Sequence, residues 1–89
     1  NEQERIAALC LSKAVKTGQQ IIQTGMDAED VLTPMRAVIE AEPLAKIDYI
    51  SMVDALTMQP AERVDRNVLV AMAVYIGKTR LIDNFSYEV

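Results

Sequence analysis

The spacing of apolar residues changes at Pro43, and this change limits the folds open to the chain. Before Pro43, apolar residues recur every three or four positions, which places their side chains on one face of a helix. After Pro43, the apolar runs are rich in Val, Ile and Tyr and are typical of strands. The pattern predicts one α+β domain spanning residues 1–89, with two N-terminal helical segments packed on a small antiparallel sheet of about three strands.

The first helical segment opens on a capping signal. Asn1 can accept a hydrogen bond from the first turn, and Glu4 can reach back to the cap. Gly18 indicates close packing or a local weakness, and Gly25 is placed to end the helix. Because the chain lacks an initiator Met and starts on a cap, we expect a preceding segment. The predicted apolar face of this helix consists of Ile6, Leu9, Cys10, Ala14, Ile21 and Ile22.

A second helical segment follows, with Asp27 as its expected cap. Pro34 either kinks a helix running from residue 27 to residue 42 or opens a shorter helix at its first turn. Pro43 ends the segment in both cases. The predicted apolar face consists of Val31, Leu32, Met35, Val38 and Ile39.

The second half of the chain predicts an antiparallel sheet. Residues 47–54 are expected to form a strand, and residues 56–66 a connection with one helical turn at most. Residues 68–76 are apolar on both faces, which favours a central strand covered on both sides over a buried helix. Gly77 and Lys78 are predicted to form a two-residue hairpin loop, with Gly where a type II′ turn needs a positive φ, and residues 79–85 are predicted to form the returning strand.

Composition excludes several classes of function. The chain has no His and one Cys, so a zinc site, a Ser–His or Cys–His pair and an internal disulfide are excluded. Its net charge of −4 argues against nucleic-acid and anionic-membrane partners. The longest uncharged apolar run is too short for a bilayer, which needs about 20 residues, and no leader pattern opens the chain. We therefore expect a cytoplasmic domain.

Polar residues of the predicted sheet are the remaining candidates for chemistry. Asp48 and Asp54 are six residues apart, an even spacing that is expected to put both on one face of the strand, but roughly 20 Å apart, too far for joint acid–base work. Arg80 stands near Asp83 and Asn84 among apolar neighbours. An ion pair between Arg80 and Asp48 or Asp54 is the favoured interpretation, and direct contact of Arg80, Asp83 or Asn84 with a substrate is the alternative.

The other candidates have structural interpretations. A phosphate loop at Gly77–Thr79 fails because its upstream glycine position holds Met72. Cys10 is expected to be a core thiol and Met35, Met52 and Met72 to be core residues. We assign no catalytic, cofactor-binding or metal-binding residue.

Several strings together resemble the C-terminal domain of the pantothenate synthetase (pantoate–β-alanine ligase) family over essentially the whole chain. The most specific is Gly-Lys-Thr-Arg-Leu-Ile-Asp-Asn at residues 77–84, followed by Ile-Asp-Tyr-Ile at residues 47–50. The strings at residues 71–74, 1–5 and 11–14 also match the pattern of that domain.

The resemblance implies the C-terminal lid domain of a larger two-domain enzyme of the coenzyme A pathway. That enzyme uses ATP and Mg²⁺ to activate pantoate as a pantoyl adenylate, which β-alanine converts to pantothenate. It also implies that the missing N-terminal domain binds the nucleotide through His-x-Gly-His and Ser-Ser-Arg motifs and forms the homodimer. The fragment alone is then expected to bind no cofactor and to be inactive, with a face more apolar than that of a monomer.

Two other interpretations remain open at this point. The chain could be a stand-alone protein-interaction module without catalytic activity, or a small ligand-binding domain with Arg80 and Asn84 as its polar contacts.

Overall fold

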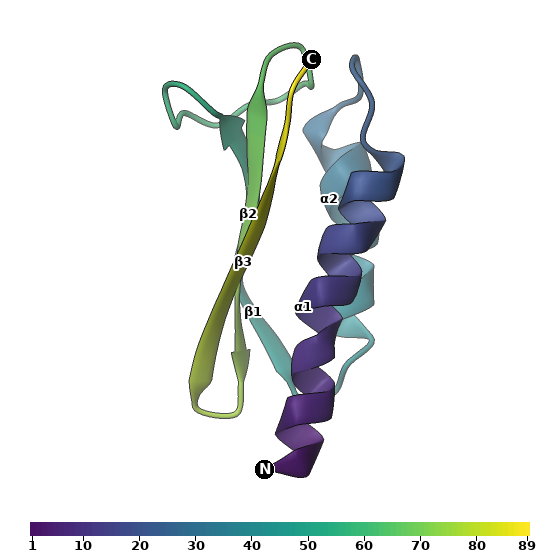
Figure 1. The fold of residues 1–89 in the computed structure, drawn as a ribbon, viewed down its shortest axis with the longest axis vertical. Coiled ribbons are helices and arrows are strands. Elements are labelled where there is room, and N and C mark those ends of the chain that lie inside the picture. The colour runs from purple at the N-terminus through teal and green to yellow at the C-terminus, as the bar shows by residue number, and fades with distance from the viewer.

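The computed structural model describes residues 1–89 and has two layers (Figure 1). Both helices cover one face of a three-stranded antiparallel sheet of order β1-β2-β3, and the two termini lie at opposite ends of the long axis. This is the predicted α+β fold. The elements are α1 (Glu2–Ile21), α2 (Ala28–Glu40), β1 (Ala45–Asp54), β2 (Val68–Ile76) and β3 (Thr79–Tyr87).

Helix α1 begins as predicted and ends earlier than predicted. The Asn1 side chain accepts a hydrogen bond from the Glu4 N–H at 2.8 Å, and Glu4 Oε1 accepts one from the Asn1 amine at 3.1 Å. The helix ends at Ile21, not at Gly25, because Ile22 adopts an extended backbone that buries its side chain in the core. A β-branched residue such as Ile has a low helix propensity, so it loses little free energy when it leaves a helix. Gly25 lies in the following loop with φ +97°.

The buried face of α1 is rotated from the predicted one. Cys10 and Ala14 are buried as expected, but Ile6 and Leu9 are 59% and 56% exposed. The prediction that Ile6 and Leu9 belong to the core-facing side of the helix was therefore wrong. A second stripe with the same helical spacing faces the core instead, and its mostly small side chains let the helix approach the rest of the domain. This buried stripe consists of Ala7, Cys10, Leu11, Ala14 and Gly18.

Helix α2 is a single helix with Pro34 inside it, so the shorter helix opened by Pro34 is excluded. Pro34 has no N–H to donate to the carbonyl one turn earlier. Asp27 is the N-cap residue, but its side chain makes no capping bond and binds Arg63 instead. The core face of α2 follows the predicted pattern through Val31, Leu32, Met35 and Ile39.

Strand β2 is the centre of the sheet and has the predicted bounds. Its helix-facing residues are all buried, at 2% exposure or less. Its other face has no helix over it, so the prediction of a strand covered on both sides holds only in part. The helix-facing row consists of Val68, Val70, Met72, Val74 and Ile76.

The β2–β3 hairpin confirms the predicted turn. Ile76 pairs directly with Thr79, so the loop has two residues, Gly77 and Lys78. Gly77 has φ +62° and Lys78 does not have a positive φ, which is the combination of a type II′ turn. Strand β3 then extends to Tyr87, two residues beyond its predicted end.

The connection between β1 and β2 begins with a single helical turn, as the sequence allowed, because the Met58 N–H donates to the Asp54 carbonyl at 2.8 Å across residues 55–57. It lies along the outer edge of β1, where the Ala61 N–H donates to the Met52 carbonyl at 3.0 Å. It also joins the start of α2, because the Ala28 N–H donates to the Glu62 carbonyl at 2.8 Å. Val64 anchors the connection with a fully buried side chain. The connection therefore shields part of an otherwise open sheet edge.

Gly18 marks the closest approach of α1 to its neighbours. A Cβ placed on this residue would lie 2.6 Å from the Met35 sulfur and 2.8 Å from the Phe85 ring. Of the two sequence interpretations of Gly18, close packing is the correct one.

We expect Gly18→Ala to destabilise the domain. Alanine favours a helix by about 1 kcal/mol over glycine, but overpacking against a ring costs about 1–3 kcal/mol, so we expect a net loss of up to about 2 kcal/mol. Thermal unfolding tests this, since each kcal/mol shifts the midpoint by roughly 4–8 °C in a domain of this size. The exposed neighbour provides the control, because Gln19→Ala should change the midpoint little. A higher midpoint for Gly18→Ala would contradict the packing argument.

Candidate functional site

The uncovered face of the sheet carries the polar group predicted around Arg80. The Arg80 guanidinium donates to Asp48 Oδ2, with distances of 3.1 Å from Nε and 3.0 Å from a terminal nitrogen. The same guanidinium carbon lies 5.9 Å from the centre of the Tyr49 ring. The favoured interpretation, an ion pair between Arg80 and a β1 aspartate, is confirmed. Arg80 is held by two neighbours and is not a free cation.

A bulge in β1 makes this contact possible. Ile47 pairs with Val74 and Tyr49 with Ala73, so Asp48 has no partner residue in β2. An extra residue in a strand shifts the alternation of side chains by one, so the side chains beyond the bulge point to the opposite face of the sheet. Asp54 therefore lies opposite Val68 in the helix-facing row, while Asp48 reaches Arg80 on the other face. The prediction that both aspartates share one face was wrong for this reason.

The three polar residues of β3 do not converge. Asn84 shares the uncovered face with Arg80, but four residues of strand separate them by roughly 14 Å. Asp83 points to the helix-facing side, opposite Met72, and accepts a hydrogen bond from the Asn84 N–H at 2.8 Å. No surface depression of the molecule is lined by Arg80 or Asn84. The geometry gives no support to a ligand site built on this pair.

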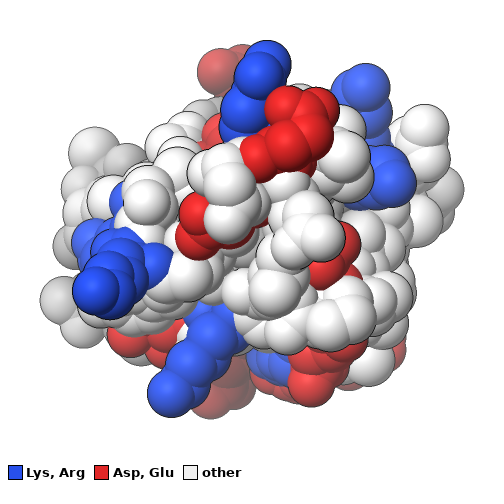
Figure 2. Space-filling model, turned by 90° about the horizontal axis from the view of Figure 1, so that it is seen from below, with Lys and Arg blue, Asp and Glu red and all other residues white.

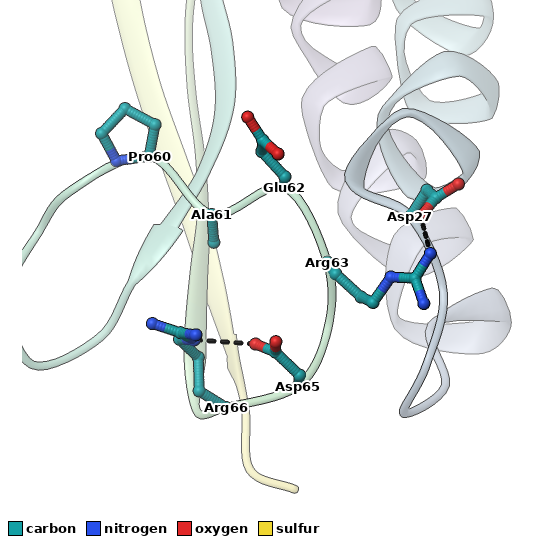
Figure 3. A pocket seen from close by; sticks show the side chains of 7 residues that line it. All are labelled: Asp27, Pro60, Ala61, Glu62, Arg63, Asp65 and Arg66. Carbon is teal, nitrogen blue, oxygen red and sulfur yellow. Dashed lines mark hydrogen bonds and ion pairs between the residues drawn. The ribbon is translucent and has the colours of Figure 1, made fainter.

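A second polar cluster surrounds an open depression beside the β1–β2 connection (Figure 3). Arg63 donates to Asp27 Oδ1 at 3.1 Å and ties the connection to the start of α2. Arg66 bonds Asp65 at 2.7 Å and Asp54 at 3.3 Å. Both arginines are therefore neutralised and unsuited to holding an anion. The depression is lined by Asp27, Pro60, Ala61, Glu62, Arg63, Asp65 and Arg66.

Hydrogen bonds hold the carboxylates of this cluster in their ionised form. The backbone N–H groups of Thr57 and Leu56 donate to Asp54, and with Arg66 they lower the pKa of its carboxyl group. A hydrogen bond from Arg66 likewise lowers the pKa of Asp65. A general acid or base needs a pKa near the working pH, so neither group is tuned for proton transfer at neutral pH. The cluster stabilises the connection.

The remaining candidates are core residues, as predicted. Burial, reinforced by the charge of Glu42, raises the pKa of the Cys10 thiol, which keeps it protonated and unreactive. Met35, Met52 and Met72 are buried. No group of three or more Cys, Asp or Glu side chains could hold a metal ion. No helix has both the length and the apolar character to cross a bilayer.

The surface at the end that carries the N-terminus has no broad region of one charge sign. Viewed from the end that carries the N-terminus, acidic and basic side chains lie beside one another (Figure 2). Every arginine forms an ion pair with a carboxylate, and no lysine does. The chain therefore offers no preformed arginine site for phosphate groups.

The feature that the sequence prediction missed is a shallow apolar groove between α1 and α2. Ile6 and Leu9 form one side, and Val38 and Ala41 form the other. The available signal was the second stripe on α1, because an apolar arc too wide for one core contact leaves some of its residues outside.

We expect the Arg80–Asp48 pair to contribute little to stability. Each side chain is 40% exposed, and such pairs contribute about 0.2–1 kcal/mol. A double-mutant cycle of Arg80→Gln and Asp48→Asn, followed by urea unfolding, should give a coupling energy in that range. A coupling energy of zero would mean that the pair does not persist in solution.

We expect the stability of the domain to depend on the ionisation of Asp54. Its pKa is lower in the folded state, so the carboxylate stabilises the fold above its unfolded-state pKa of about 3.9, and this stabilisation disappears as the pH falls through the folded-state value. Asp54→Asn keeps an acceptor oxygen for both N–H groups but cannot ionise. The difference in unfolding free energy between wild type and variant should therefore be largest near neutral pH and shrink towards pH 2.

Urea unfolding at several pH values measures this difference. Glu88→Gln is a suitable control, because Glu88 is exposed and takes part in no ion pair. A wild type and an Asp54→Asn variant that lose stability in parallel would contradict the prediction.

Comparison with known proteins identifies the relatives of the chain. A family model described as Pantoate-beta-alanine ligase matches residues 1–86. Pantothenate synthetase from Ruminiclostridium cellulolyticum is 54% identical over 88 residues, which is 98% of this chain and 31% of that protein. Pantothenate synthetase from Clostridium botulinum (strain Loch Maree / Type A3) is 48% identical over 89 residues, 99% of this chain and 32% of that protein.

A solved structure shares the fold. The crystal structure of pantothenate synthetase from Thermus thermophilus matches with a TM-score of 0.84 at 22% identity, covering 96% of this chain and 31% of that one. The chain thus spans about a third of the length of its relatives and corresponds to their C-terminal part.

Proposed function

The chain belongs to the pantoate–β-alanine ligase family, and we propose that residues 1–89 form the lid domain of an ATP-dependent ligase. In the proposed reaction, the pantoate carboxylate attacks the α-phosphate of ATP and pyrophosphate leaves. The amine of β-alanine then attacks the acyl carbon of the adenylate, which releases AMP and forms the amide of pantothenate. The observation that carries this proposal is the family match over residues 1–86.

The residues of this chain support a covering function and not a chemical one. The chain has no His, its arginines are already paired, and its aspartates with shifted pKa values are held ionised. These residues do not fit a Mg²⁺–ATP site, so we propose that a preceding N-terminal domain binds ATP and Mg²⁺. We also propose that this N-terminal domain forms the homodimer. An acyl adenylate is easily hydrolysed, and a lid protects it by excluding water. We place the enzyme in the cytoplasm.

The test is a comparison of two proteins. We expect the 89-residue chain alone to form no pantothenate from pantoate, β-alanine and ATP. The full-length gene product, which includes the segment preceding residue 1, should form pantothenate and release one AMP and one pyrophosphate per product. Turnover by the 89 residues alone would overturn the lid proposal. An inactive full-length product that binds an unrelated protein would favour the interaction module instead.

A further inference from the structure

In the groove between α1 and α2, neighbouring large aliphatic side chains are exposed to solvent. Ile6 is 59% exposed and Leu9 is 56% exposed, and they face Val38 and Ala41 across the groove. Single exposed aliphatic residues are normal on a protein surface, but a contiguous group of them at one place is typical of an interaction site.

The apolar exposure on this flank of α1 is confined to the N-terminal half of the helix. Continuing from Ile6 and Leu9 at helical spacing, the next residues on the same flank are Lys13, Lys16 and Gln20, and all three are polar and largely exposed. On this flank of α1, exposed apolar side chains therefore occur only near Asn1. Ile6 and Leu9 lie roughly 8 and 12 Å along the helix axis from that residue, at about 1.5 Å per residue.

The end of α1 that carries the groove is also the end to which the rest of the protein would connect. The chain corresponds to the C-terminal third of its relatives, and in those relatives the other two thirds precede the matching segment. A domain joined through Asn1 has its nearest surface beside the first turns of α1.

We propose that this groove, formed by Ile6, Leu9, Val38 and Ala41, is the surface on which the preceding N-terminal domain docks. The inference rests on the proposed function for the existence of that domain, and it adds which face of the lid meets it. The rim of the groove holds Lys13 and Glu42, one charge of each sign. The contact is therefore apolar at its centre and polar at its edge, as in other protein interfaces.

The uncovered face of the sheet is the competing surface, and Ile82 is 59% exposed on it, but its β3 neighbours Arg80 and Asn84 on the same face are polar. Tyr49 and Ile82 flank Ala73, which is fully buried although no helix covers it. Arg80 lies over Tyr49 and is neutralised by Asp48. A sheet face of this kind can remain in water.

Thiol labelling of the full-length gene product tests the proposal with a matched pair of variants. Ile6 and Ile82 have the same exposed fraction, 59%, one in the groove and the other on the sheet face. We expect a cysteine in Ile6→Cys to react with a maleimide at least about tenfold more slowly than one in Ile82→Cys, because docking must open before the thiol reacts. Mass spectrometry assigns the labelled site, and Cys10 stays unreactive because it is buried.

Each outcome decides the question. Equal labelling rates, or slower labelling of Ile82→Cys, overturn the proposal. Protection of Ile6→Cys that disappears on dilution identifies a second copy of the chain as the occupant and also overturns it. Protection that survives dilution supports docking within one chain.

The labelling experiment tests the docking surface and the ligase assay tests the proposed function, so either hypothesis can be contradicted without the other. Protection of Ile6→Cys in a full-length protein without ligase activity would leave the docking surface standing and remove the proposed function. An active ligase with equal labelling rates would do the reverse. A second variant, Ile6→Gln with Leu9→Gln, should leave the fold intact, since both residues are exposed helix positions. In the full-length product, protease should cut the segment joining the proposed N-terminal domain to residue 1 at least about tenfold faster in this variant than in Ile82→Thr.

Discussion

The fold depends on one row of side chains, the five residues of β2 that face the helices. Each is almost completely removed from water, and burial of an aliphatic side chain of this size contributes roughly 1.5–3 kcal/mol. Strands β1 and β3 pair with β2 on its two sides, and α1 and α2 lie over the row. Because the row contains every second residue, a slip of one position would expose it completely. The pairing register is therefore fixed, and with it the place of Arg80 beside Tyr49 and Asp48.

Features set by neighbours in the chain were predictable, and features set by distant contacts were not. The cap at Asn1 and the turn at Gly77 rest on signals within four residues, and both were correct. The end of α1 was wrong because Ile22 leaves the helix to reach a core that the local sequence does not define. The exposed position of Ile6 was missed because two stripes on α1 have the same spacing, and only packing against α2 and the sheet chooses between them.

The candidate site shows the same division. A partner for Arg80 could be anticipated, because an arginine among apolar strand residues has to be satisfied. Which aspartate it binds could not, since the choice depends on a bulge at Asp48 that has no local signature. The pairing of Arg63 with Asp27 was also hidden, because 36 residues separate them and only the packing of the connection brings them together. The sequence therefore identified which polar residues needed partners, but the partners themselves are determined by the tertiary structure.

The charge arrangement constrains how such a domain could close over a polyanionic substrate. Its arginines are already bound to its own carboxylates. Its lysines form no ion pair, but the net charge of −4 opposes the approach of phosphate groups, so their attraction would contribute little to closure. The free energy of closure must then come mainly from apolar contact. A few aliphatic side chains contribute several kcal/mol at most, by the roughly 1.5–3 kcal/mol that full burial of one gives. A lid held this weakly can exclude water during the reaction and still open at each turnover to release product. An extended apolar interface would make the closed state too stable for that cycle.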